Sequence, residues 1–271
     1  MGPTSGEDHS TLDAKKMGHI PFGNRPADVQ TVVATMYGNS SRIRTASGVF
    51  VLQAPLSVHG CASFDISAAG LTTIAGYPFA SSPSGTPAEV VVGDASHVQL
   101  YSPHNNVTAS ISRAHAEALP PIATIPLGRI VPETSSSTLT GGSLGRGIAG
   151  FVDLFFHPTF LVASRFFTNK KIEILGNVSY GGRDAWELEG TQVASAPQES
   201  ELGNHWRMWV DKESGVVVRL EYYSDTHLLG WIEMQNLVIN EHGTPLNSPA
   251  WSIPSTARTV DFDTFNRLPR P

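Results

Sequence analysis

Residues 205–240 constrain the fold of this chain most, because their pattern predicts three consecutive β-strands. Large apolar and polar side chains alternate with a period of two in residues 206–210, 216–223 and 228–239. Polar turns separate the three runs, and the first turn ends in Gly215. An antiparallel meander is therefore expected here.

Both faces of the third strand carry apolar side chains. The pattern places Trp231, Leu237 and Ile239 on one face, and Ile232, Met234 and Val238 on the other. A sheet covered on one side and solvated on the other alternates more cleanly between apolar and polar residues. We therefore expect both faces to contact apolar material, whether a core, a lid or a cavity.

The rest of the chain predicts one helix and more strands. Near the start, apolar residues recur at helical spacing: Val29, Val32, Val33, Met36 and Tyr37. Alternating runs predict a hairpin over 41–53 and 58–67, a second over 89–92 and 97–101, and strands over 107–113, 171–175, 178–180 and 186–192. Residues 70–88 are rich in Gly, Pro and Ser, and we expect a loop on the rim there.

Composition argues against a nucleic-acid partner. Charged residues make up 15% of the chain, below the roughly 25% of average proteins. The net charge is -6, and no basic run is longer than Lys170-Lys171. Cys61 is the only cysteine, so no internal disulfide can form. It is expected to be a small buried apolar residue, with a reactive thiol or a lipidated cysteine as the alternatives.

The 271 residues fit one all-β domain with two tails. We expect residues 1–23 to be a disordered tail or tether, 24–245 the folded domain and 246–271 a Pro-rich tail. Within that tail, residues 260–265 predict a short strand or helical turn. The first 16 residues contain no apolar signal region. The expectation is therefore either a cytoplasmic protein or an exported one whose export or anchor segment is absent from this chain.

The middle of the chain breaks the strand pattern. Residues 114–150 are interrupted by Pro, Ser and Gly, and long irregular segments inside compact domains tend to be functional or mobile. Residues 148–167 are the most apolar stretch, but Asp153, His157 and Pro158 interrupt it. This makes a poor bilayer span, and two short helices that fill a barrel are expected instead.

Two stretches resemble the LolA-like superfamily. Residues 209–230 read WVDKESGVVVRLEYYSDTHLLG, with the Trp, Asp, polar turn and acidic-aromatic strand end of those proteins. Residues 182–190, GRDAWELEG, are similar to the preceding strand, most closely that of the MucB/RseB N-terminal domain. The resemblance implies an α+β fold: an unclosed antiparallel β-barrel, or half-barrel, with helices plugging its concave face. It also implies an extracytoplasmic location, in the periplasm or at the outer face of the cytoplasmic membrane, and binding of lipid or acyl groups.

Motifs for catalysis or metal binding are weak. Gly141 to Gly145 match G-x-S-x-G, the nucleophile elbow, with Ser143 as the nucleophile, but no alternation of strands and helices surrounds them. A flexible Gly/Ser loop is the preferred interpretation. The ten histidines contain no H-x-x-x-H spacing, and no C-x-x-C is present, so we predict neither a metal nor a cofactor.

Two pairs of glutamates, Glu187 with Glu189 and Glu221 with Glu233, can share a strand face or lie across a strand pair. Solvated sheet surface is preferred over acid-base catalysis for both pairs, because no other chemistry-bearing residue converges on them.

Aromatic side chains are the candidates for a ligand cavity, with a packed core as an equal alternative. The cavity candidates are Phe50, Phe64, Phe151, Phe155, Phe160, Trp186, Trp209 and Trp231.

Three functions compete at this point. The first is an extracytoplasmic protein that binds a lipid or acyl chain, as a lipoprotein carrier or as an RseB-like envelope sensor. Its partners would be a lipid, an acylated protein, or, as the resemblance implies, an anti-sigma factor or another membrane-anchored protein. The second is a barrel enzyme for a hydrophobic small molecule, recognised by a polar cluster inside an apolar cavity. The third is a filled-core domain that binds a protein through its rim or a free strand edge. A binding protein is preferred over an enzyme.

Overall fold

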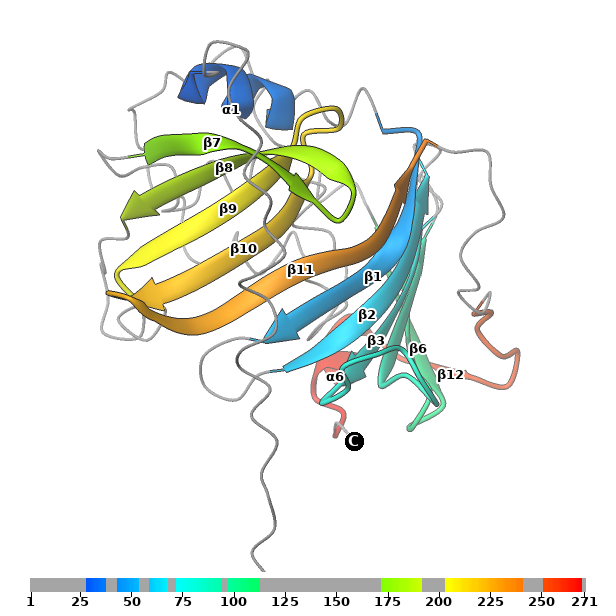
Figure 1. Ribbon diagram of the computed structural model, residues 1–271. Coiled ribbons are helices and arrows are strands. Elements are labelled where there is room, and N and C mark those ends of the chain that lie inside the picture. The colour runs from blue at the N-terminus through cyan, green and yellow to red at the C-terminus, as the bar shows by residue number, and fades with distance from the viewer. Residues whose placement is uncertain are drawn as a thin grey trace, which may run out of the picture.

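In the residues that the structure describes, twelve strands form one sheet that does not close into a barrel, as seen in a computed structural model of the chain (Figure 1). The sheet curves around a concave face, so the predicted half-barrel is confirmed. The structure describes residues 28–37, 43–53, 59–67, 72–93, 97–112, 172–191, 203–240 and 251–269.

The helix predicted near the start is α1 (Val29–Tyr37). Asp28 precedes it, and its carboxylate accepts hydrogen bonds from the backbone N–H and the hydroxyl of Thr31. Such a cap satisfies a helix N–H that has no partner within the helix. The apolar stripe of α1 buries Val32, Val33 and Met36, so the predicted helical face is confirmed.

Six strands form an antiparallel meander in the first half of the chain. They are β1 (Thr45–Gln53), β2 (His59–Ser67), β3 (Thr72–Pro78), β4 (Glu89–Gly93), β5 (His97–Ser102) and β6 (Val107–Ser112).

The prediction of a loop over residues 70–88 is wrong for its first part, which forms β3. This strand lies between β2 and β4 in the sheet. Ile74 points to one face and Ala75 and Tyr77 to the other, and all three are buried. The Gly and Ser content concealed the alternation, and pairing on both sides supplies the stability that the local sequence lacks.

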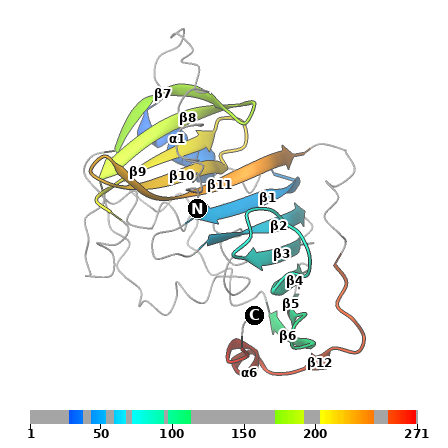
Figure 2. The same cartoon turned by 60° about the horizontal axis from the view of Figure 1, so that its bottom comes forward.

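Five further strands form a second antiparallel meander. They are β7 (Ile172–Tyr180), β8 (Arg183–Thr191), β9 (His205–Asp211), β10 (Val217–Ser224) and β11 (His227–Ile239). The three strands predicted over residues 205–240 are thus confirmed. β11 pairs with β1 and joins the two meanders into one sheet, whose strands lie side by side in Figure 2.

A bulge in β11 changes which residues face which side. Asn236 has a positive φ of 51°, and the pairing with β1 shifts between Val49↔Gln235 and Ser47↔Val238. The extra residue moves Ile239 into the cluster that contains Ile232 and Met234. The prediction that Ile239 shares a face with Trp231 is therefore wrong.

The end of the chain returns to the sheet edge. β12 (Arg258–Thr259) pairs in parallel with β6, and α6 (Phe262–Asn266) follows it. The strand or helical turn expected over residues 260–265 is confirmed by α6. In the part of the chain that the structure describes, no helix is long and apolar enough to cross a membrane.

Candidate functional site

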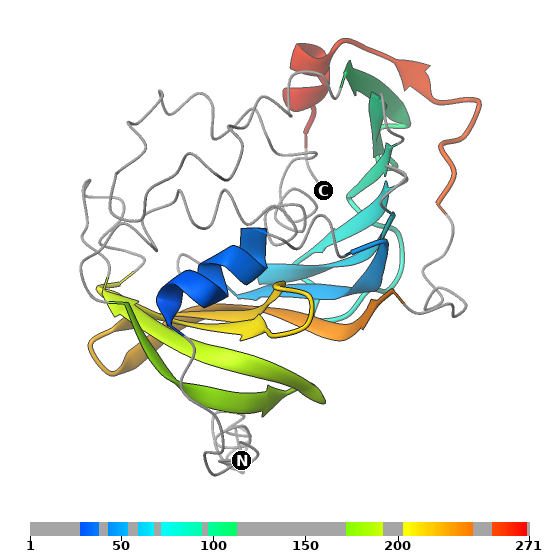
Figure 3. The same cartoon turned by 90° about the horizontal axis from the view of Figure 1, so that it is seen from above.

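The concave face of the sheet is lined by buried apolar side chains from both meanders. We call it the inner face, and it carries both α1 and α6 (Figure 3). Cross-strand pairing arranges its side chains in rows. One row contains Ile174, Leu188, Met208, Leu220 and Ile232. Another contains Phe64, Ile74, Val91, Leu100 and Ala109.

The two helices contact different ends of this face. α1 packs near β7 and against the turn between β9 and β10, and α6 packs on β6. Between them, Phe50, Phe64 and Met234 are buried in the same apolar cluster. The inner face is therefore apolar from β8 across to β6, which is the surface chemistry that an acyl chain requires.

The structure divides the predicted cavity residues between two faces. Phe50 and Phe64 lie on the inner face, and Trp186 is half-buried beside the same cluster. Trp209 and Trp231 lie on the opposite, outer face. Phe151, Phe155 and Phe160, with the rest of residues 148–167 and the G-x-S-x-G motif, lie outside the described residues.

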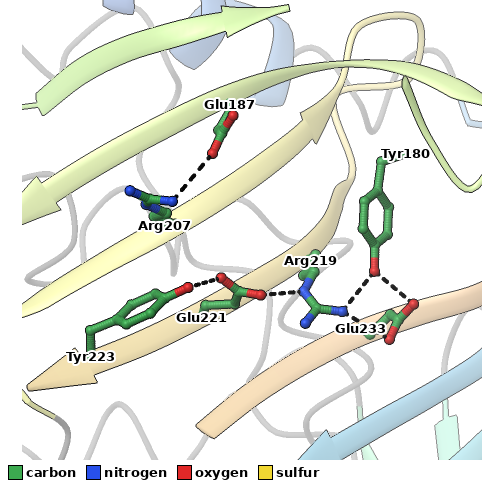
Figure 4. Close-up of polar contacts among 7 residues, drawn as sticks. All are labelled: Tyr180, Glu187, Arg207, Arg219, Glu221, Tyr223 and Glu233. Carbon is green, nitrogen blue, oxygen red and sulfur yellow. Dashed lines mark hydrogen bonds and ion pairs between the residues drawn. The ribbon is translucent and has the colours of Figure 1, made fainter. Parts of the chain in front are cut away.

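The outer face of β7 to β11 carries a charged network centred on Arg219 (Figure 4). The Arg219 Nε donates to Glu221 Oε1 at 2.7 Å, and its Nη1 donates to Glu233 Oε2 at 3.2 Å. The same Nη1 donates to the hydroxyl of Tyr180 at 2.9 Å, and that hydroxyl donates to Glu233 Oε1 at 2.7 Å. The Tyr223 hydroxyl donates to Glu221 Oε2.

Aromatic rings surround the same guanidinium. The Cζ of Arg219 lies 5.3 Å from the ring centroid of Trp231, 5.8 Å from that of Tyr180 and 5.9 Å from that of Trp209. These distances are within the range of cation-π attraction. Charge, hydrogen bonds and ring contacts thus hold Arg219 of β10 against residues of β7, β9 and β11.

A second arginine, Arg207, continues the network toward β8. Its Nε donates to Glu189 Oε2 at 3.0 Å, and its Nη1 lies 4.0 Å from Glu187 Oε1. The side chain of Arg207 is 41% exposed, whereas that of Arg219 is 13% exposed. The network therefore has a solvated half and a desolvated half.

All four predicted glutamates lie on the outer face, so each pair shares a face as expected, but solvated surface is the wrong description of Glu221. Glu187 and Glu189 both pair toward β9 on this face. Glu221 is only 5% exposed, because Arg219 and Tyr223 lie against it. A charge buried to this extent has to be paired, and Arg219 supplies the counter-charge.

Burial keeps the tyrosines of the network protonated. It raises the pKa of Tyr180 above its ordinary value, and the hydrogen bond to Glu233 raises that pKa further. Burial and the hydrogen bond to Glu221 do the same to the pKa of Tyr223. Both hydroxyls are therefore donors at neutral pH, and neither can act as a base.

Sequence reasoning missed the network because it considered the glutamates alone. Arg219, Glu221 and Tyr223 recur with a period of two on β10, and Glu233 faces them from β11. Ionisable residues at alternate positions of a strand that is otherwise apolar were the signal that could have found it. The network lies on the face opposite the apolar rows.

Asp211 fixes the turn between β9 and β10. Its carboxylate accepts from Arg183 Nε at 2.7 Å, and from the backbone N–H and hydroxyl of Ser214, each at 2.6 Å. Gly215 closes the turn with a positive φ of 74°, and a Cβ there would clash with the carbonyl oxygen of Thr35 in α1. The turn thus packs directly against α1, and a side chain at position 215 would displace the helix from the sheet.

The Asp211 carboxylate makes the free energy of unfolding depend on pH in the acidic range. Burial acts to raise its pKa, but the hydrogen bonds from Arg183 and Ser214 outweigh burial, and the pKa lies below its ordinary value. Its contribution is therefore present above the pKa of an unfolded aspartate, about 4, and is lost as pH falls through the lower folded pKa. We expect Asp211→Asn to lower the free energy of unfolding by about 2 kcal/mol at pH 7 and to flatten its decline below pH 4, measured by urea denaturation. Parallel pH profiles for the two proteins would contradict this assignment.

Cys61 is fully buried on the outer face of β2, as expected for a small apolar residue. Burial raises the pKa of its thiol to about 11, so the reactive thiolate is scarce at neutral pH. Among the residues that the structure describes, no group of three His, Cys, Asp or Glu side chains could hold a metal ion.

No protein-family model matches the chain, and no curated protein matches it. Solved structures do resemble it in fold. An uncharacterized conserved protein from Thermus thermophilus has a TM-score of 0.44 and 9% identity, covering 86% of this chain and 99% of its own. MucB in complex with MucA(peri) has a TM-score of 0.43 and 11% identity, covering 86% of this chain and 62% of its own.

The lipoprotein LppX of Mycobacterium tuberculosis is similar at a TM-score of 0.39 and 11% identity, covering 80% of this chain and 100% of its own. The chain spans about 62% of the MucB chain in its complex.

Proposed function

We propose that this protein binds a lipid or an acyl chain on the inner face of its open sheet. The observation that carries the proposal is the continuity of that face, whose paired rows are apolar from β8 to β6. Each buried CH₂ of a ligand contributes roughly 0.8 kcal/mol, so binding needs no charged anchor. The charged network lies on the outer face, which favours binding over catalysis on a hydrophobic substrate.

The proposed setting is outside the cytoplasmic membrane. It follows from the resemblance of residues 209–230 to LolA-like proteins, which also implies a role as a lipoprotein carrier or an envelope sensor. The names of the similar structures include a lipoprotein, an outer membrane lipoprotein-sorting protein domain and a complex with MucA(peri). For this chain, the proposed partner is correspondingly an acylated or membrane-anchored protein, such as an anti-sigma factor.

One observation favours a second function. Phe50, Ile74 and Leu100 on the inner face are completely buried, as they would be in a filled core. A filled core would leave the rim or a strand edge to bind a protein partner. The same experiment separates the two functions.

Native mass spectrometry of the purified protein tests the proposal. We expect a bound species that solvent extraction identifies as a lipid or fatty acid. Met234→Gln places an amide on the inner face at nearly constant volume, and an amide buried without a partner costs about 1–3 kcal/mol. We therefore expect the affinity for that species to fall about tenfold.

The neighbouring residue supplies the control. Gln235 lies on the outer face, paired with Val49, so Gln235→Lys should leave binding unchanged. Circular dichroism and thermal unfolding of both variants show whether each is folded. A protein whose mass stays that of the bare chain after incubation with lipids would overturn the proposal and favour the filled core.

A further inference from the structure

The last described segment of the chain, residues 251–269, contacts the β5–β6 end of the sheet on both faces and along its edge. Trp251 and Ile253 pack against the apolar cluster of the outer face, which includes Tyr101. β12 then pairs with the edge of β6, and α6 turns onto the inner face (Figure 3). We call this segment the C-terminal strap.

A single aromatic side chain provides most of the strap's burial on the inner face. Phe265 is completely buried and belongs to the same cluster as Val107 and Ala109 of β6. Phe262, on the same short helix, is 37% exposed. Of the residues from 261 to 269, only Phe265 is buried and Leu268 half-buried, while the others are exposed.

The remaining attachments of the strap include side-chain hydrogen bonds from Asn105 Nδ2 to the Pro269 carbonyl oxygen at 3.1 Å and from Asn106 Nδ2 to the Thr256 carbonyl oxygen at 3.2 Å. β12 contributes two paired residues, and backbone hydrogen bonds run from Arg258 to Asn106 at 3.0 Å and from Val260 to Thr108 at 2.9 Å. Asp261 caps α6 by accepting from the backbone N–H of Thr264 at 2.8 Å and from its hydroxyl. Every other strand pair of the sheet would survive the departure of this segment, because β12 is an edge strand that pairs only with β6.

We propose that the place filled by Phe265 is a subsite for the apolar end of the ligand, and that Phe265 is its displaceable occupant. This inference rests on the proposed function. The place is continuous with the apolar rows of the inner face, and a phenyl ring and an acyl chain have the same chemistry there. The ligand and the Phe265 ring compete for the same space. The apparent affinity for the ligand is therefore reduced in proportion to the fraction of molecules in which the strap is docked on β6.

Palmitate binding to the full chain, measured by equilibrium dialysis, tests the competition. Phe265→Ala removes most of the occupant, and we expect the apparent Kd for palmitate to fall about tenfold. Phe262→Ala changes an exposed ring on the same helix and should leave the Kd unchanged. Weaker binding by Phe265→Ala would show that Phe265 is a wall of the ligand site and would overturn the inference.

Hydrogen exchange gives a second readout that does not require a core substitution. When palmitate binds the unaltered chain, the amides of Arg258 and Val260 should exchange faster, because their hydrogen bonds to Asn106 and Thr108 break when the strap leaves β6. Asp261→Ala weakens the cap of α6 and should also tighten palmitate binding.

Two negative results have different meanings. Equal palmitate affinity in all variants, with unchanged exchange at Arg258 and Val260, would overturn the subsite while the proposed function stands. Failure of every form to bind palmitate or any extracted lipid would overturn the proposed function and the subsite together.

Discussion

Trp206→Ala is expected to lower the free energy of unfolding by about 4 kcal/mol, the usual cost of truncating a fully buried tryptophan. Trp206 lies on the inner face of β9 and is completely buried there. It sits directly over Gly190 on β8, its cross-strand partner. A Cβ at Gly190 would clash with the Trp206 ring, so the missing side chain of the glycine leaves the space that the indole ring occupies.

The contact between Gly190 and Trp206 predicts that substitutions at the two positions have coupled effects on the free energy of unfolding. Urea denaturation of a double-mutant cycle measures this coupling. Gly190→Ala alone should destabilise the protein, because the indole ring has to move. In the Trp206→Ala background the same change should cost about 2 kcal/mol less, because the ring is gone. Additive costs would contradict the contact. Phe79→Ala is the control, since Phe79 is 68% exposed and should change stability by less than about 0.5 kcal/mol.

Arg219→Met should destabilise the protein by about 3–5 kcal/mol, because it leaves two desolvated carboxylates without their counter-charge. The side chains of Glu221 and Glu233 are 7% and 20% exposed. Arg207→Met on the same face should cost less than about 1 kcal/mol, since Arg207 is solvated and its ion pairs are screened. Urea denaturation of both variants at pH 7 measures the difference.

Neutralising the partners should reverse much of the loss. Adding Glu221→Gln and Glu233→Gln to Arg219→Met removes the uncompensated charges, and the triple variant should be more stable than Arg219→Met alone. If the triple variant is no more stable, the role of Arg219 is packing between its three aromatic rings and not charge. Equal losses for Arg207→Met and Arg219→Met would contradict the difference in desolvation.

Local pattern predicted most of the elements. The stripe of apolar residues in α1 and the period-two runs of β9, β10 and β11 depend on neighbours three, four or two residues apart, and these are visible in any single sequence. The half-barrel was expected from the resemblance in residues 209–230, and the sheet order confirms it. β3 was missed because its stability comes from pairing with β2 and β4.

The assignment of residues to faces came only from the tertiary structure. Trp209 and Trp231 were predicted with Phe50 and Phe64 as one cavity, but pairing places the tryptophans on the outer face around Arg219. Alternation in the sequence shows only that neighbouring side chains point to opposite faces of the sheet. A single bulge, such as that at Asn236, reverses the face to which every later residue of the strand points.

By itself, the sequence determined that this chain forms an apolar antiparallel sheet with α1 before its first strand, because those features depend on local periodicity. The tertiary structure alone decided that Arg219 of β10 contacts residues of β7, β9 and β11, and that Phe265 reaches the core beside β6. Those contacts join residues far apart in the chain, and their energy exists only once the sheet has brought the strands together.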